Sequence, residues 1–164
     1  PPLPMFRHEY HLVREQVLTS PLEEVFQYFA DAGNLQELTP AWLHFHIHTP
    51  LPIEMGKDAL IDYSLRLFAV PIRWRTQILI WDPPGRFVDI QLKGPYKTWR
   101  HTHEFIADPR GTRVIDRVLY ELPIAPFGRL AHPFFVRPSL ERIFDYRRDQ
   151  MARRFDTIPL TPGT

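Results

Sequence analysis

The sequence predicts an α+β fold in which a curved antiparallel sheet of about seven strands wraps around a long C-terminal helix. Extended segments follow one another between residues 43 and 122 with only short turn signals between them, which indicates an antiparallel meander. Apolar residues then recur at three- and four-residue steps from residue 139 to residue 155, as in a helix that buries one face. Two short helical segments precede the meander and are placed to close one end of the sheet.

The N-terminal part predicts one strand and two short helices. Residues 8–18 suit the first strand. Residues 20–23, Ser-Pro-Leu-Glu, predict a capping box with proline at the first helical position. A second helix is expected at residues 34–38, where Thr-Pro ends it.

The six strands of the meander are expected at residues 43–49, 59–68, 72–81, 87–93, 97–107 and 112–122. Residues 125–138 contain three prolines and predict an irregular segment before the terminal helix, and residues 158–164 predict a frayed tail. We expect a single domain over residues 1–164 with its core at about residues 8–156. A curved sheet that grips a helix leaves a cavity between them, where small-molecule pockets often lie.

The composition restricts the classes of function. The chain has no cysteine, which excludes disulfides, thiolate zinc sites and a cysteine nucleophile. A net charge of +1 gives no field that attracts nucleic acid. No apolar run reaches the roughly 18 residues that span a bilayer, so we expect a cytoplasmic protein without membrane insertion. Glycine-rich phosphate loops and dinucleotide fingerprints are missing, so no cofactor is expected.

The segment 97–107 carries the most unusual pattern in the chain. Trp99, His101, His103 and Phe105 alternate along it and share one strand face. A core face normally carries valines and leucines, whereas this one places two imidazoles between aromatic rings. Either the sheet encloses a pocket with a polar wall, or it buries two histidines that need partners.

Short hairpin loops place a carboxylate beside each of these histidines. If the Asp-Pro-Arg-Gly and Gly-Pro-Tyr turns are hairpin loops, the register puts His101 opposite Asp89 and His103 opposite Asp116. The same registers give the pairs Trp99–Tyr120, Phe105–Val114, Phe87–His103 and Gln91–Trp99. Directly paired side chains lie roughly 5 Å apart at Cβ, so we expect the contacts His101–Asp89 and His103–Asp116.

This cluster is the candidate site, and it allows three interpretations. It could orient the carbonyl or hydroxyl group of a ligand, move a proton in catalysis, or simply satisfy its own hydrogen bonds and fix the strand register. The candidate catalytic residues are His101, His103 and Asp116. The candidate ligand-binding residues are Tyr63, Trp74, Phe87, Asp89, Gln91, Trp99, His101, His103, Asp116, Tyr120 and Phe144.

Either of the two faces of the predicted strand at residues 87–93 could point into the interior. Val88, Ile90 and Leu92 form the more apolar face, and if they point inward, Asp89 is exposed and loses its contact with His101. If Asp89 points inward instead, the three aliphatic side chains form an outer stripe that invites a partner, such as a second copy of the chain.

Two further polar patterns have structural interpretations. His44, His46 and His48 alternate on one predicted strand, and two of them could reach one ion. Solvent-facing positions on an edge strand explain them better, so no metal is expected. Acidic residues interleave with four arginines of the terminal helix, which predicts a solvated helix face. These arginines are Arg147, Arg148, Arg153 and Arg154.

Four runs of the chain also carry a family resemblance: residues 34–42, 61–63, 81–84 and 94–105. In these motifs the chain resembles the SRPBCC superfamily, which includes START-like and Bet v 1-like helix-grip proteins and polyketide cyclase/dehydrase-type members. It looks most like single-domain bacterial proteins of that group. The resemblance covers about residues 8–155 and implies a helix-grip fold with a deep cavity. No catalytic residue set of the superfamily maps onto this chain.

The sequence thus favours a module that binds a hydrophobic or aromatic small molecule, lipid-like or polyketide-like, with the His/Asp cluster at its polar end. One alternative is a cyclase-like or dehydratase-like enzyme that uses His101 or His103 as general acid or base. The other is a dimeric protein-interaction domain.

Overall fold

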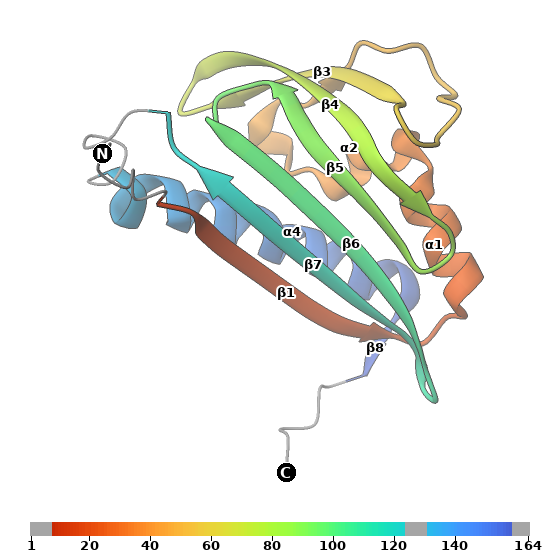
Figure 1. Cartoon of the computed structure of the whole chain (residues 1–164). Helices are drawn as coiled ribbons and strands as arrows, with labels where there is room; N and C mark the ends of the chain where they lie inside the picture. The colour runs from red at the N-terminus through yellow and green to blue at the C-terminus, as the bar shows by residue number, and fades with distance from the viewer. Residues whose placement is uncertain (1–7, 124–130, 159–164) are drawn as a thin grey trace, which may run out of the picture.

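The computed structural model of the protein describes residues 8–123 and 131–158. Within these residues, eight antiparallel strands form one curved sheet in the order β2-β3-β4-β5-β6-β7-β1-β8, and α4 lies along one face of it (Figure 1). The predicted fold class is confirmed: a curved antiparallel sheet wraps around a long C-terminal helix, and two short helices follow the first strand.

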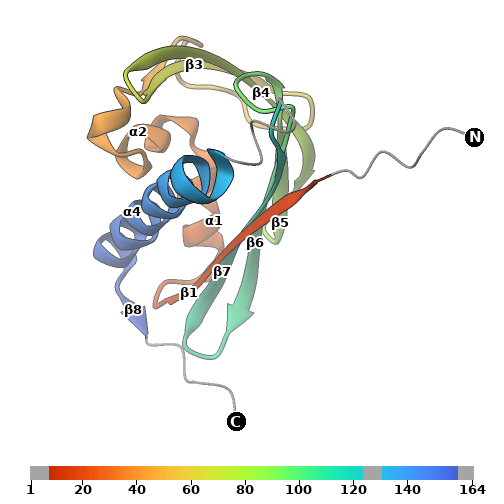
Figure 2. The same ribbon diagram turned by 90° about the vertical axis from the view of Figure 1, so that its left-hand side faces the viewer.

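The strands are β1 (Tyr10–Leu18), β2 (His46–Ile47), β3 (Leu60–Leu67), β4 (Val70–Asp82), β5 (Arg86–Lys93), β6 (Thr98–Asp108), β7 (Gly111–Glu121) and β8 (Thr157–Ile158). The helical segments are α1 (Leu22–Ala30), η1 (Ala32–Asn34), α2 (Leu35–Leu38), η2 (Ala41–Leu43), η3 (His132–Val136) and α4 (Arg137–Phe155). Figure 2 shows the sheet from one side, with α4 inside its curve and β3 bending over α2 and α4.

Three boundaries differ from the sequence prediction for local reasons. The expected strand at residues 43–49 is only two residues long, because Leu43 ends η2 and His44 has a left-handed φ of 46°. The capping box does not form, since α1 begins at Leu22 after Pro21 and no side chain caps it. Thr157 and Ile158 pair with β1 as β8, and the rest of the expected tail lies outside the described residues.

The proline-rich segment before α4 is helical where the structure describes it. His132–Val136 form a π-helical segment that continues into α4, whereas residues 124–130 lie outside the described part. Pro133 is the second residue of η3, where a missing backbone N–H costs no helical hydrogen bond. Pro138 is the second residue of α4, which follows η3 without a break. The expectation of an irregular segment here was wrong because it treated these prolines only as breakers.

The β6–β7 hairpin fixes the register of the site. Asp108 pairs with Gly111, so the loop has two residues rather than the expected four, and the predicted pairs His103–Asp116 and Trp99–Tyr120 are confirmed. Gly111 has a φ of 141°, and a Cβ there would overlap the carbonyl oxygen of Leu18. Glycine is therefore required where this hairpin meets the end of β1.

The interior is divided into two apolar clusters. One packs α1 and the C-terminal half of α4 against the sheet, with Phe26, Phe105 and Met151 among its members. The other packs the N-terminal half of α4 against β4, β6 and β7, with Trp99 and Phe144 among its members. The polar residues of β5, β6 and β7 lie on the same inner face, between these two clusters.

Two polar contacts connect α4 to β1 and to Thr19, the residue that follows β1. Arg14 Nε lies 2.9 Å from Asp145 Oδ1, and the Thr19 hydroxyl donates to the Phe155 carbonyl oxygen at 2.7 Å. The middle and the C-terminal end of α4 are thereby fixed relative to the sheet. Among the residues that the structure describes, no helix is long and apolar enough to cross a membrane.

Candidate functional site

A cavity of about 180 Å³ lies between the inner face of β3–β6 and the helices α1, α2 and α4. Aromatic and aliphatic side chains form most of its wall. Eight of the candidate ligand-binding residues line it: Tyr63, Trp74, Phe87, Asp89, Trp99, His101, His103 and Phe144. The structure therefore brings these eight together around one space.

The other three candidates do not line the cavity. Gln91 donates to and accepts from the backbone of Tyr96 at 2.7 and 3.2 Å, so it closes the β5–β6 turn. The Tyr120 hydroxyl lies 2.7 Å from His132 Nε2, directed to the helix rather than to the cavity. Asp116 lies behind the two histidines and contacts them from the side of α4. For Gln91 and Tyr120 these partners are ones that the strand register alone does not reveal.

Several lining residues were missed because they resemble ordinary core positions. They are supplied by the segments that close the cavity opposite the histidines, and include Leu38, Leu43, Phe45, Ile61, Leu65 and Ile143. The apolar stripes of the short helices and of α4 were the available signal, but a stripe alone does not distinguish a cavity wall from a filled core.

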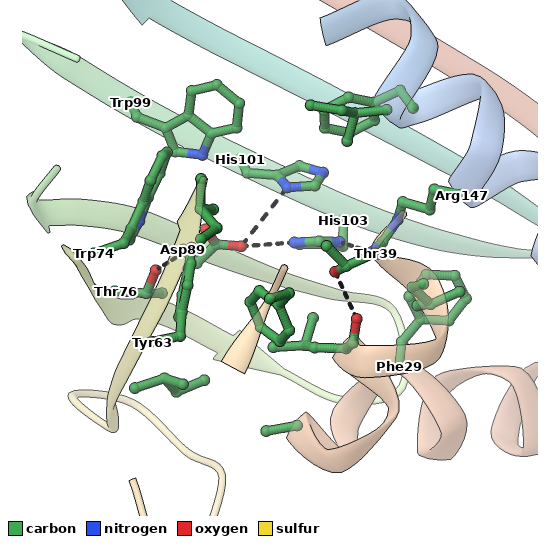
Figure 3. A pocket seen from close by; sticks show the side chains of 18 of the residues that line it. Phe29, Thr39, Tyr63, Trp74, Thr76, Asp89, Trp99, His101, His103 and Arg147 are labelled. Carbon is green, nitrogen blue, oxygen red and sulfur yellow. Dashed lines mark hydrogen bonds and ion pairs between the residues drawn. The ribbon is translucent and has the colours of Figure 1, made fainter. Parts of the chain in front are cut away.

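Asp89, His101 and His103 form the polar wall of the cavity (Figure 3). His103 Nε2 lies 2.7 Å from Asp89 Oδ2, and His101 Nδ1 lies 3.9 Å from the same oxygen. The two imidazole rings are 3.7 Å apart between centroids. One carboxylate oxygen thus faces one nitrogen from each ring.

Asp116 contacts the opposite nitrogens of the same two rings. Its Oδ1 atom lies 2.8 Å from His101 Nε2 and 3.2 Å from His103 Nδ1. The shortest contacts are therefore diagonal, His101 to Asp116 and His103 to Asp89, whereas the sequence predicted the directly opposite pairs. On the β5 side, Phe87 lies directly across from His103 and stacks on its ring at 4.1 Å.

Arg147 is the residue that the sequence interpretation placed wrongly. It is buried, its Nε atom lies 3.4 Å from Asp116 Oδ2, and its Nη2 atom lies 3.4 Å from His103 Nδ1. Its guanidinium also covers the Phe29 ring. A signal was present, because Arg147 stands three residues after Phe144 and four before Met151 on the apolar stripe of α4.

Burial and mutual contact shift the pKa values in this cluster. Burial opposes the charged form of Asp116, but Arg147 and both imidazoles hold its pKa well below the usual range. Burial likewise opposes ionisation of Asp89, yet the His103 hydrogen bond and the neighbouring imidazoles lower its pKa. Both carboxylates are therefore charged at neutral pH.

The two histidines shift in opposite directions. Burial and the neighbouring His103 lower the pKa of His101. Burial also acts to lower the pKa of His103, but its hydrogen bonds with Asp116 and Asp89 raise it overall. A neutral His101 that donates from Nε2 to Asp116 leaves the Nδ1 lone pair directed to the Asp89 side.

The remaining predicted histidines form no comparable group. His46 and His48 have their rings 4.8 Å apart on the exposed edge of the sheet, while His44 lies outside the strand. Within residues 8–123 and 131–158, the histidine and carboxylate atoms close enough to share an ion belong to Asp89, His101 and His103.

The outer face of β5 does not carry the predicted row of three exposed aliphatic side chains. Asp89 points inward, but Val88 is only 1% exposed, Ile90 is half-buried and Leu92 is exposed. Val88 pairs with Ile80 on one side and Thr102 on the other. The expectation of three exposed aliphatic residues was wrong, and a homodimer through this face stays a prediction.

No protein-family model and no curated protein matches the chain. Solved structures with the same fold do match it. A protein of Thermus thermophilus is 20% identical, with a TM-score of 0.69 over 89% of this chain and 95% of that one. The major latex-like protein 151 of Panax ginseng is 11% identical, with a TM-score of 0.63 over 90% and 97%. A norcoclaurine synthase of Thalictrum, solved with a transition-state analogue, is 10% identical, with a TM-score of 0.63 over 90% and 97%.

Proposed function

Since the chain has the helix-grip fold of Bet v 1-like and SRPBCC-type proteins, we propose that it binds a small aromatic molecule between the sheet and α4. The observation that carries the proposal is the cavity itself, a mostly apolar space with a polar wall that includes Asp89, His101, His103 and Arg147. Binding sites for small molecules combine these two features, because the apolar wall gives affinity and the few polar groups give orientation.

The cavity volume restricts the size of the ligand. A cavity of about 150 Å³ holds one benzene molecule, so about 180 Å³ suits one ring or two fused rings. A long acyl chain needs considerably more space. Tyr63, Trp74 and Trp99 offer ring faces and edges in the wall, which favours a flat aromatic ligand over a branched aliphatic one.

The polar wall determines the orientation of the ligand. Asp89 accepts hydrogen bonds, and a neutral His101 offers an acceptor lone pair at Nδ1. A ligand hydroxyl group is the complementary donor. We therefore expect a phenol-like or naphthol-like molecule to bind with its hydroxyl group at this wall and its rings between Tyr63 and Phe144.

A variant that fills the cavity tests this proposal. Leu65 lies on β3, lines the cavity and is partly buried, whereas Leu60 on the same strand is 44% exposed and does not line it. We expect 2-naphthol to bind the wild type and Leu60→Trp equally, and Leu65→Trp about tenfold more weakly or not at all. Isothermal titration calorimetry measures the affinity, with EDTA present throughout.

The proposal is wrong if the wild type binds no one-ring or two-ring phenol at about 1 mM, or if Leu65→Trp binds as well as Leu60→Trp. Palmitate serves as the long-chain comparison. Stronger binding of palmitate than of every aromatic probe would contradict the size argument.

The alternative functions predicted from the sequence stay predictions. His101 and His103 line the cavity and are hydrogen-bonded to carboxylates, and a carboxylate can orient an imidazole that acts as general acid or base. No feature of the described site selects a particular reaction, so binding is the function that the geometry supports best.

A further inference from the structure

We propose that Asp89, His101 and His103 bind one divalent first-row transition metal ion, such as Zn²⁺, at the cavity wall. This inference goes beyond the proposed aromatic ligand and does not depend on it. It also departs from the sequence prediction that no metal is bound. It rests on the positions of three ligand atoms and on the groups that hold the two histidines in place.

The three ligand atoms converge on one point. Asp89 Oδ2, His103 Nε2 and His101 Nδ1 all lie within 4.8 Å of one another. The oxygen is 2.7 Å from one nitrogen and 3.9 Å from the other. Tetrahedral zinc ligands at about 2.1 Å from the ion are about 3.4 Å apart, so the two separations from Asp89 Oδ2 need to change by about 0.5–0.7 Å. The two nitrogens, which lie within 4.8 Å of each other, need to approach by no more than about 1.4 Å.

Asp116 holds the histidines as a ligand set requires. Histidines that bind metals usually donate their other ring N–H to a carboxylate or carbonyl, which fixes the tautomer and the ring orientation. Here His101 Nε2 is hydrogen-bonded to Asp116 Oδ1 at 2.8 Å. His103 Nδ1 lies 3.2 Å from the same oxygen and 3.4 Å from Arg147 Nη2.

The charges around this point favour a cation. Asp89 and Asp116 are charged carboxylates, and Arg147 is the guanidinium that contacts the cluster. With neutral imidazoles, the group carries one excess negative charge. Arg147 lies on the Asp116 side, against His103 Nδ1 and away from the ligand nitrogen Nε2.

The ligand set also determines the class of metal. Two imidazoles and one carboxylate suit Zn²⁺, Fe²⁺, Co²⁺ or Ni²⁺, whereas Mg²⁺ and Ca²⁺ prefer an all-oxygen set. The three ligands line the cavity but Asp116 does not, so the remaining coordination positions open toward the cavity. An oxygen atom of a small molecule can occupy them.

Metal titration of the stripped protein tests this inference. We expect the wild type, treated with EDTA and dialysed, to bind one equivalent of Zn²⁺ by calorimetry. Asp89→Asn and His103→Gln should weaken binding by about 100-fold or more, because each removes a ligand. Asp116→Asn keeps all three ligands and should weaken binding by about 10- to 100-fold.

The control variants separate this site from others. His46→Gln/His48→Gln removes the exposed pair of histidines at β2 and just after it, the alternative place for adventitious metal. This variant should bind one equivalent as tightly as the wild type. Leu65→Trp should also keep its zinc affinity while losing 2-naphthol. Zinc affinity without naphthol binding would refute only the proposed function, and naphthol binding without zinc affinity would refute only this inference.

Cobalt provides a measurement on the wild type that does not depend on stable variants. Two ligated imidazoles that keep their outer N–H groups should give two exchangeable, paramagnetically shifted proton resonances with Co²⁺, in the wild type and in His46→Gln/His48→Gln alike. The inference is refuted if these resonances are missing or depend on His46 and His48. It is equally refuted if the wild type takes up no stoichiometric Zn²⁺.

Discussion

At the scale of single residues, Asp116 connects the two halves of the polar cluster. One of its oxygens faces both imidazoles, and the other faces Arg147. Because Asp116 is buried and its partners are buried, its charge is balanced by contacts rather than by water. Its role differs from that of Asp89, which faces the cavity.

This difference predicts a large effect of Asp116 on stability. Asp116→Asn leaves the Arg147 guanidinium buried without its carboxylate, so the free energy of unfolding should fall by about 3 kcal/mol or more. The exposed pair of Asp62 and Arg75, with side chains 41% and 48% exposed, provides the control. Asp62→Asn should cost less than about 1 kcal/mol.

Urea unfolding of both variants at neutral pH measures the two values. Equal losses for Asp116→Asn and Asp62→Asn would contradict the assignment of Asp116 as the balancing charge of the buried cluster.

At the scale of elements, the β6–β7 hairpin determines which side chains share a face. Its tight turn fixes Asp108 opposite Gly111 and thereby places His103 opposite Asp116 farther along the same two strands. The turn also packs against the end of β1, where Leu18 approaches the backbone of Gly111. The register of the site therefore depends on one glycine far from the cavity.

Substitution of this glycine should show that dependence. Gly111→Ala places a Cβ against the Leu18 carbonyl at a φ of 141°, so the free energy of unfolding should fall by more than about 2 kcal/mol. Gly56→Ala is the matched control, because a Cβ there meets nothing within 4 Å. Its effect should be within about 1 kcal/mol. Thermal unfolding monitored by circular dichroism compares them, and a stable Gly111→Ala protein would contradict the argument.

At the scale of the whole molecule, the cavity and the apolar core share one interior. Met151 is fully buried in the core at the α1 side, whereas Ile143 lies on the same helix and borders the cavity. The same type of truncation should therefore have different consequences at these two positions of α4.

Met151→Ala creates a new cavity in a packed region and should lower the free energy of unfolding by about 2–5 kcal/mol. Ile143→Ala enlarges a space that already exists and removes a partly buried side chain, so it should cost less. Urea unfolding measures both, and a larger loss for Ile143→Ala would show that the space beside it is filled in solution.

The fold could be predicted from local sequence patterns because the residues that form each pattern lie close together in the chain. Alternation with short turns defines β6 and β7, and helical periodicity defines α4. The registers that pair His101 with Asp89 and His103 with Asp116 were also predictable, since the length of a hairpin loop constrains which residues lie opposite each other. The amino-acid sequence and the geometry of β-strands are enough to predict these features.

Local patterns in the chain were therefore enough to specify the curved sheet, its terminal helix, and a strand face shared by the two histidines. They left open whether Asp89 or the aliphatic face of its strand points inward. The contacts among these side chains followed only from the folded structure, because side-chain directions depend on packing between distant elements. The folded structure brings His103 to Asp89, diagonally across the strands, and the rotation of α4 against the sheet buries Arg147 beside Asp116. It is this packing that leaves space beside Asp89 and none beside Asp116.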